Sequence, residues 1–206
     1  MLLEQMTTQE FKTATLVYSG ALKELATKIE IINDEFASGQ ARNPIEHFKL
    51  RMKSASSMAA KLRRKGLEPT FENAVANLDD IAGVRIICSF TPDIYKISDI
   101  ILSRADITVV KIKDYIKTPK ENGYRSLHII LEVPVFLSNE IRQTRVELQI
   151  RTIAMDFWAS LDHKIRYKFE KSAPQQINTD LFECAEIVAR LDKKMYELNR
   201  EIECYK

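Results

Sequence analysis

The stretch Gly123-Tyr124-Arg125-Ser126-Leu127-His128 decides the fold, because it joins a polar turn to a strongly apolar segment. Pro119 and the dipeptide Asn122-Gly123 mark the turn. The apolar segment that follows, Leu127 to Phe136, predicts a β-strand. Tyr124 and His128 are therefore expected where a rigid strand leaves a loop, which is a common place for binding and catalytic residues.

A second strand is predicted at residues 145–151, where polar and apolar side chains alternate. The apolar set, which we expect to face the core, is Val146, Leu148 and Ile150. The polar set on the opposite face is Arg145, Glu147, Gln149 and Arg151. Four polar groups in a row indicate a strand face that borders a site or solvent. A hairpin at residues 137–140 should pair this strand antiparallel with the preceding one, which brings His128 towards Ile150 and Arg151.

The remaining segments complete one domain. Strands are predicted at about 84–90 and 107–112, with a helix from Thr91 to about Arg104 between them. Apolar residues at steps of three and four predict further helices at about 8–36, 44–65, 153–169 and 179–205. This order predicts an α+β fold with one mixed, mainly antiparallel β-sheet flanked by helices.

The helix expected at residues 44–65 would have two different faces. Asn43 can cap it and Pro44 suits its first position. Its apolar face comprises Phe48, Met52, Ala55, Ala59 and Leu62. The opposite, polar face comprises Arg51, Ser54, Ser57, Lys61 and Arg64. Without other information, such a polar stripe is most simply a solvated helix face.

The two terminal helices carry narrow apolar stripes, from Phe11 to Phe36 and from Leu181 to Tyr205. Stripes of this width favour helix-against-helix contacts between subunits, although the last helix can also pack on its own domain. The helix at 153–169 is expected to bury Ala154, Phe157, Trp158, Leu161 and Ile165.

Composition narrows the class of protein. The chain has 206 residues, 45% of them hydrophobic and 29% charged, which is typical of a globular domain with a sizeable core. A net charge of +2 argues against a generally basic, nucleic-acid-binding surface. We expect no signal peptide and no membrane span. Three cysteines without CxxC spacing predict reduced thiols in a cytoplasmic protein and no zinc site.

Several motifs together resemble the synthetase domain of the RelA/SpoT family, whose members make the alarmones (p)ppGpp. They are Lys113-Asp114-Tyr115-Ile116, Pro119-Lys120, Asn122 to His128, and Val146 to Thr152. The resemblance implies a nucleotidyltransferase-like sheet and covers about residues 43–168. It divides the chain into an N-terminal helix (1–42), a catalytic domain (43–170) and a C-terminal helix (171–206). The chain has no His-Asp dipeptide of the kind found in the family's hydrolase domain, so it looks like a stand-alone synthetase.

The same resemblance implies a reaction and its residues. Pyrophosphate would pass from ATP to the 3′-hydroxyl of GDP or GTP. Asp80 and Glu147 would be catalytic and hold Mg²⁺. The residues implied for ATP are Arg51, Lys53, Ser57, Lys61, Arg64 and Arg85. Those implied for the guanine nucleotide are Lys113, Lys120, Asn122, Tyr124 and His128, with Tyr124 stacking on the base. Small members of the family also imply a homotetramer.

Other interpretations stay open from the sequence. Asp80 could be a turn cap, and the lysines near the signature stretch could simply be solvated. The acceptor could be a different 3′-hydroxyl, such as a tRNA end. The protein could instead be a regulator that binds single-stranded RNA, or a purely structural oligomer. An intact carboxylate pair with nearby cations favours the enzyme.

Overall fold

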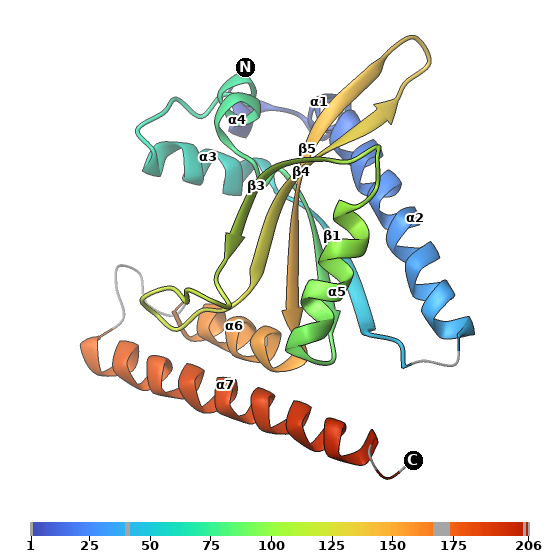
Figure 1. Cartoon of the computed structure of the whole chain (residues 1–206). Helices are drawn as coiled ribbons and strands as arrows, with labels where there is room; N and C mark the ends of the chain where they lie inside the picture. The colour runs from blue at the N-terminus through green and yellow to red at the C-terminus, as the bar shows by residue number, and fades with distance from the viewer. Residues whose placement is uncertain (1, 40–41, 167–173, 204, 206) are drawn as a thin grey trace.

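The structure is a computed structural model that describes residues 2–39, 42–166, 174–203 and 205. Its centre is a five-stranded sheet in the order β1-β2-β5-β4-β3 (Figure 1). The strands are β1 (Ile45–Met52), β2 (Ala82–Cys88), β3 (Thr108–Asp114), β4 (Leu127–Phe136) and β5 (Ile141–Thr152). Only β2 and β5 run parallel, and the other three pairings are antiparallel. The predicted mixed, mainly antiparallel sheet with flanking helices is therefore confirmed.

Helices surround this sheet. They are α1 (Thr8–Ala14), α2 (Leu16–Ser38), α3 (Ala55–Arg64), α4 (Phe71–Asn77), α5 (Thr91–Leu102), α6 (Ile153–Arg166) and α7 (Gln175–Glu203), with a short 3-10 turn, η1, at Leu3–Gln5. Of these, α4 was not predicted from the sequence. None of the described helices has both the length and the apolar character needed to cross a membrane.

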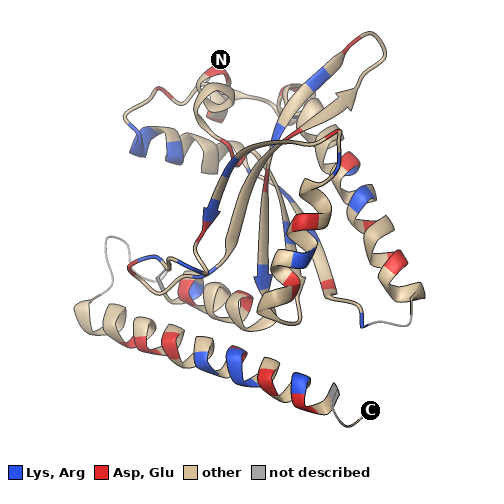
Figure 2. Cartoon of the chain, in the orientation of Figure 1, with Lys and Arg blue, Asp and Glu red and all other residues tan. Residues whose placement is uncertain are grey.

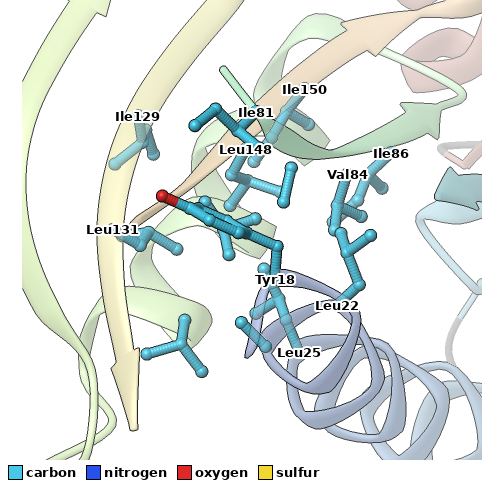
Figure 3. Close-up of a cluster of buried hydrophobic side chains, with 14 of the residues drawn as sticks. Tyr18, Leu22, Leu25, Ile81, Val84, Ile86, Ile129, Leu131, Leu148 and Ile150 are labelled. Carbon is cyan, nitrogen blue, oxygen red and sulfur yellow. The ribbon is translucent and has the colours of Figure 1, made fainter. Parts of the chain in front are cut away.

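The hydrophobic core lies on one face of the sheet. Tyr18, Leu22 and Leu25 of α2 pack against the inward side chains of β2, β4 and β5 (Figure 3). Alternation along each strand places Val84 and Ile86, for example, on this face, and Arg85 on the other. The polar side chains of the central strands are thereby collected on the opposite face of the sheet.

The helix predicted at residues 44–65 is wrong in its first half. Residues 45–52 form β1, which pairs antiparallel with β2, and only residues 55–64 are helical. Phe48 and Met52 lie four residues apart, a spacing that suits one face of a strand as well as a helix. The missed signal is Ser54, whose side chain accepts a hydrogen bond from the backbone N–H of Ser57 and so caps α3. Asn43 also caps no helix, because its side chain accepts from the backbone N–H of Ile45 at the start of β1.

The first helix has the predicted extent, but it is interrupted at Thr15. Its apolar stripe is covered by the chain's own sheet, since Leu25 and Ile29 are fully buried there. The expectation that this stripe contacts another subunit therefore loses its basis. A role for the whole N-terminal segment in assembly remains a prediction.

The expected buried face of the helix after β5 is largely wrong. Trp158 is buried as predicted, and its indole N–H donates to the carbonyl of Leu181 in α7. Phe157, Leu161 and Ile165 are exposed instead, with Phe157 at 59%. The helix turns Met155 and Trp158 inwards because α7 packs against it, a contact that periodicity within one helix does not reveal.

The apolar stripe of α7 is divided between two environments. Leu181 is buried within the chain, whereas residues of the later turns are exposed. The exposed members of the predicted stripe include Leu191, Met195, Leu198 and Ile202. Acidic and basic residues also appear along the helix (Figure 2). The C-terminal half of α7 thus presents apolar side chains that its own domain does not cover.

Candidate active site

Asp80 and Glu147 line one cavity of about 330 Å³ on the polar face of the sheet. Glu147 lies on β5 beside Gly83 of β2, and Asp80 lies in the turn just before β2. The parallel pairing of these two strands therefore brings together carboxylates that are far apart in the sequence. Arg51, Lys53 and Arg85 line the same cavity, so it combines acidic and basic groups.

Asp80 is held by two lysines. Its Oδ2 atom lies 2.6 Å from Lys53 Nζ and 2.8 Å from Lys61 Nζ. Burial favours the neutral acid, but the hydrogen bonds and charges of the two lysines prevail and lower the pKa of Asp80 below its ordinary value. The other oxygen, Oδ1, is buried and has no hydrogen-bond partner within the described part of the chain. Asp80 is thus an ionised carboxylate with one oxygen free for a ligand.

Glu147 is oriented by a chain of hydrogen bonds. Its Oε1 atom lies 3.0 Å from His128 Nδ1, and His128 Nε2 lies 2.7 Å from the Tyr124 hydroxyl. An ionised carboxylate can only accept, so Nδ1 carries the proton, and in the neutral imidazole Nε2 accepts from Tyr124. Gln149 donates to Oε2 at 2.8 Å. Burial disfavours the charged form of Glu147, but the bonds from His128 and Gln149 lower its pKa below the ordinary value.

Arg151 completes this network, although the sequence prediction left it out of the site. Its side chain is 6% exposed, and Nη2 donates to the Tyr124 hydroxyl at 2.6 Å. Nη1 donates to Asp156 at 2.9 Å, and Asp156 also accepts from Arg85 at 3.2 Å. The signal was present in the sequence, because Arg151 continues the alternating polar face that carries Glu147 and Gln149.

The residues predicted for ATP do not share one helical stripe. Arg51 lies on β1, Lys53 follows that strand, and Lys61 lies on α3. Lys53 and Lys61 converge on Asp80, while Arg51 and Arg85 line both the first cavity and an adjoining one of about 690 Å³. Ser57 lies in the first turn of α3, and its hydroxyl accepts from Ser54 at 2.9 Å. Arg64 is exposed in the last turn of α3, a helix rich in basic residues (Figure 2).

The residues predicted for the guanine nucleotide surround Tyr124. Lys120 Nζ lies 4.9 Å from the centre of the Tyr124 ring, and Lys113 pairs with His128 across β3 and β4. Asn122 accepts a hydrogen bond from the backbone N–H of Tyr124 at 3.3 Å, so it shapes the turn. Both ring nitrogens of His128 are engaged within the chain. In this structure His128 therefore serves Glu147 and Tyr124, and its implied contact with the guanine nucleotide stays a prediction.

The two carboxylates fit a magnesium ion. A hard cation that also binds nucleotide phosphates needs only one or two protein carboxylates. Asp80 and Glu147 line the same cavity, and Asp80 Oδ1 has a lone pair available. A cluster of three or more His, Cys, Asp or Glu side chains suited to a metal is not found among the described residues. The donor set therefore suits a metal shared with a substrate better than a closed structural site.

A mixed sheet that gathers two carboxylates and convergent cations on its polar face is suited to the transfer of a phosphorylated group. Residues 50–172 match the family model "Region found in RelA / SpoT proteins". The chain belongs to this family.

Individual relatives agree with this assignment over nearly the whole chain. GTP pyrophosphokinase YwaC of Bacillus subtilis is 50% identical over 195 residues, which cover 95% of this chain and 93% of the relative. GTP pyrophosphokinase YjbM of the same organism is 34% identical, covering 96% and 92%. The crystal structure of small alarmone synthetase 1 from Bacillus subtilis bound to its product pppGpp superposes with a TM-score of 0.87 at 34% identity, covering 94% of this chain and 98% of that chain.

Proposed function

We propose that this chain is a GTP pyrophosphokinase that transfers pyrophosphate from ATP to the 3′-hydroxyl of GDP or GTP, giving (p)ppGpp and AMP. The observation that carries the proposal is the pair Asp80 and Glu147, which line one cavity together with four basic residues. The similarity of this structure to that of a synthetase bound to pppGpp supports a guanine nucleotide as the acceptor.

ATP is assigned to the two adjoining cavities beside β1 and β2, and the larger one also reaches Tyr124, where the acceptor is assigned. Arg51 and Arg85 line both of them, and a guanidinium plane stacks well on a purine. Lys53 and Lys61 lie at Asp80, where their charges suit a triphosphate. Asp80 and Glu147 would hold Mg²⁺, which when bound would neutralise charge that develops on the phosphates.

Glu147 is assigned as the general base. In the transfer, the acceptor 3′-oxygen forms a bond to the β-phosphorus of ATP, and the bond from that phosphorus to the α–β bridging oxygen breaks. AMP leaves with that oxygen, and Glu147 takes the proton of the 3′-hydroxyl. His128 and Gln149 hold the carboxylate in place and keep it ionised. Catalysis of this kind depends mainly on positioning and charge stabilisation.

Tyr124 is assigned as the platform for guanine. Its hydroxyl is fixed by Arg151 and His128, so its ring has a defined orientation at the mouth of the site. Lys120 stands over the ring and has an exposed side chain. A base that stacks on this ring would displace the Lys120 ammonium group, whose charge would then be available to the acceptor's phosphates.

Assembly through α7 is part of the proposal. The exposed apolar residues in the C-terminal half of the helix would be covered by another copy of the chain. Closed symmetry favours a dimer or a dimer of dimers, and the tetramer is the form we propose.

The test of the function is a comparison of acceptors. The purified protein is incubated with magnesium and γ-labelled ATP plus GMP, GDP, GTP or tRNA in turn, and the products are separated by thin-layer chromatography. Labelled pppGpp or ppGpp with GTP or GDP supports the proposal. Label transferred only to tRNA, or to no acceptor, contradicts it.

A further inference from the structure

The loop that carries Tyr124 rests directly on the C-terminal helix. Gly123 has a φ of +82°, a conformation that favours glycine, and it is buried. A Cβ atom placed on Gly123 would lie 2.5 Å from the Cβ of Ala185 in α7. The backbone of the loop therefore approaches the helix more closely than any other residue type permits. In Figure 1, α7 lies beside α6 across the end of the sheet from which this loop emerges.

Arg125 ties the same loop to the same helix by an ion pair. Its Nη2 atom donates to Glu186 Oε1 at 2.9 Å, and its Nη1 atom donates to the carbonyl of Gly123 at 3.2 Å. The Arg125 side chain is 17% exposed and that of Glu186 is 42% exposed, so solvent screens the pair only from the glutamate side. Tyr124 contacts His128 and Arg151, whereas Arg125 contacts α7, so these neighbours bind different parts of the protein.

The helix is itself anchored on both sides of Glu186. Its Leu181 carbonyl accepts from the Trp158 indole at 3.0 Å. Its Asp192 accepts from the Thr152 hydroxyl at 2.7 Å, and Thr152 follows Arg151 directly at the end of β5. Helix α7 is thus held in place by the rest of the domain, and the bond from Arg125 to Glu186 fixes the loop relative to this helix.

We propose that Arg125 and Glu186 are a positioning pair, which holds Tyr124 where it stacks on the guanine of the acceptor. The hydrogen bonds from Arg125 to Gly123 and Glu186 involve no residue assigned to ATP or to Mg²⁺, so the effect of the pair is expected on the acceptor and not on ATP. Glu186 lies beyond residues 50–172, the part that matches the family model, so the family motifs do not assign it. This inference rests on the proposed function, which makes Tyr124 a guanine platform.

The experiment is a double-mutant cycle with Arg125→Gln, Glu186→Gln and the double variant. Each single change should raise the KM and the Kd for GDP about three- to tenfold, the range expected for coupling between residues in contact. The KM for ATP should change less than about twofold by the same reasoning. The double variant should be no worse than Arg125→Gln alone. The control is Glu183→Gln, an exposed carboxylate on the same helix, which should match the wild type.

Three results would overturn the inference: additive effects of the two changes, equal effects on ATP and GDP, or wild-type affinity for GDP in both single variants. Thermal melting of every variant identifies a general loss of folding, which would appear as equal losses for both nucleotides. The Kd for GDP is measured by calorimetry without turnover. A wild-type chain that binds GDP but makes no product would refute the proposed function. The double-mutant cycle, evaluated with the Kd for GDP, would still decide the role of the Arg125–Glu186 pair.

Discussion

Replacing Tyr124 separates two roles that the structure gives to one side chain. The ring is proposed to stack on guanine, and the hydroxyl accepts from Arg151 at 2.6 Å and lies 2.7 Å from His128 Nε2. Tyr124→Ala removes both functions, whereas Tyr124→Phe keeps the ring and removes only the hydroxyl. The pair of variants therefore distinguishes loss of acceptor binding from loss of catalytic geometry.

The magnitudes follow from these contacts. A base stacked on an aromatic ring contributes about 1–3 kcal/mol, so Tyr124→Ala should raise the KM for GDP on the order of ten- to a hundredfold. A hydrogen bond to a charged group contributes about 1.5–3 kcal/mol, and its loss should lower kcat of Tyr124→Phe on the order of ten- to a hundredfold, because His128 loses the bond that fixes its ring beside Glu147. The KM of Tyr124→Phe for GDP should stay within about threefold of the wild type, since the stacking surface remains.

The assay is steady-state formation of ppGpp with ATP and GDP varied in turn, accompanied by thermal melting of each variant. Ser126→Ala is unsuitable as a control because its hydroxyl is buried beside Arg151, so the exposed Lys117→Ala is used instead. A selective rise in the KM for ATP in Tyr124→Ala would place this ring on the wrong substrate. Unchanged kcat in Tyr124→Phe would show that the hydrogen-bond chain to Glu147 has no catalytic role.

Three further predictions concern the carboxylates, a buried acid and assembly. Asp80→Asn and Glu147→Gln should each lower kcat at least ~10²-fold without lowering the melting temperature much, and near wild-type turnover at saturating magnesium would exclude either residue from catalysis. Burial raises the pKa of Asp192, although the hydrogen bond from Thr152 opposes this shift. The contribution of this group to the free energy of unfolding is therefore largest below its ordinary pKa, and it is lost as the pH rises through the pKa of the folded state. The melting temperature of Asp192→Asn should therefore rise relative to that of the wild type as the pH increases from about 4 to 7. A difference in melting temperature that stays constant over this range would contradict the prediction. Leu191→Glu combined with Leu198→Glu should reduce the mass measured by light scattering to that of a single chain, because both side chains are exposed in the isolated chain and would be buried by a partner. The control is Lys194→Glu, which lies off this stripe. A wild-type mass equal to that of one chain would refute assembly.

Strands β4 and β5 could be predicted, because β4 is a long apolar segment after a turn and β5 alternates with a period of two. The bounds of β4 agree with the prediction at both ends, and the predicted hairpin brings His128 opposite Gln149, next to the expected neighbour Ile150. The first strand could not be predicted in this way. The side chains of β1 are mostly exposed and its apolar residues are also spaced as in a helix, whereas β3, the other exposed edge strand, is identified by its β-branched residues.

The two carboxylates of the site were predicted, but their surroundings were not. Asp80 and Glu147 stand in motifs that resemble a family, whereas the lysine pair on Asp80 depends on the turn from β1 into α3. Arg151 and the contact of Gly123 with α7 depend on tertiary packing between segments about 30 to 60 residues apart, which periodicity does not report. The exposure of Phe157 has the same cause, because α7 decides which side of α6 is buried.

The most direct test of the central claim is the stoichiometry of transfer from ATP labelled on its β-phosphate. If the acceptor oxygen attacks the β-phosphorus, the label moves into pppGpp and one AMP appears for each pppGpp formed, with no ADP. Glu147→Gln should lower both products together, because one step makes them. Formation of ADP with an unlabelled pppGp, which is the product of transferring the γ-phosphate alone, or hydrolysis of ATP without a labelled guanine nucleotide, would contradict the account.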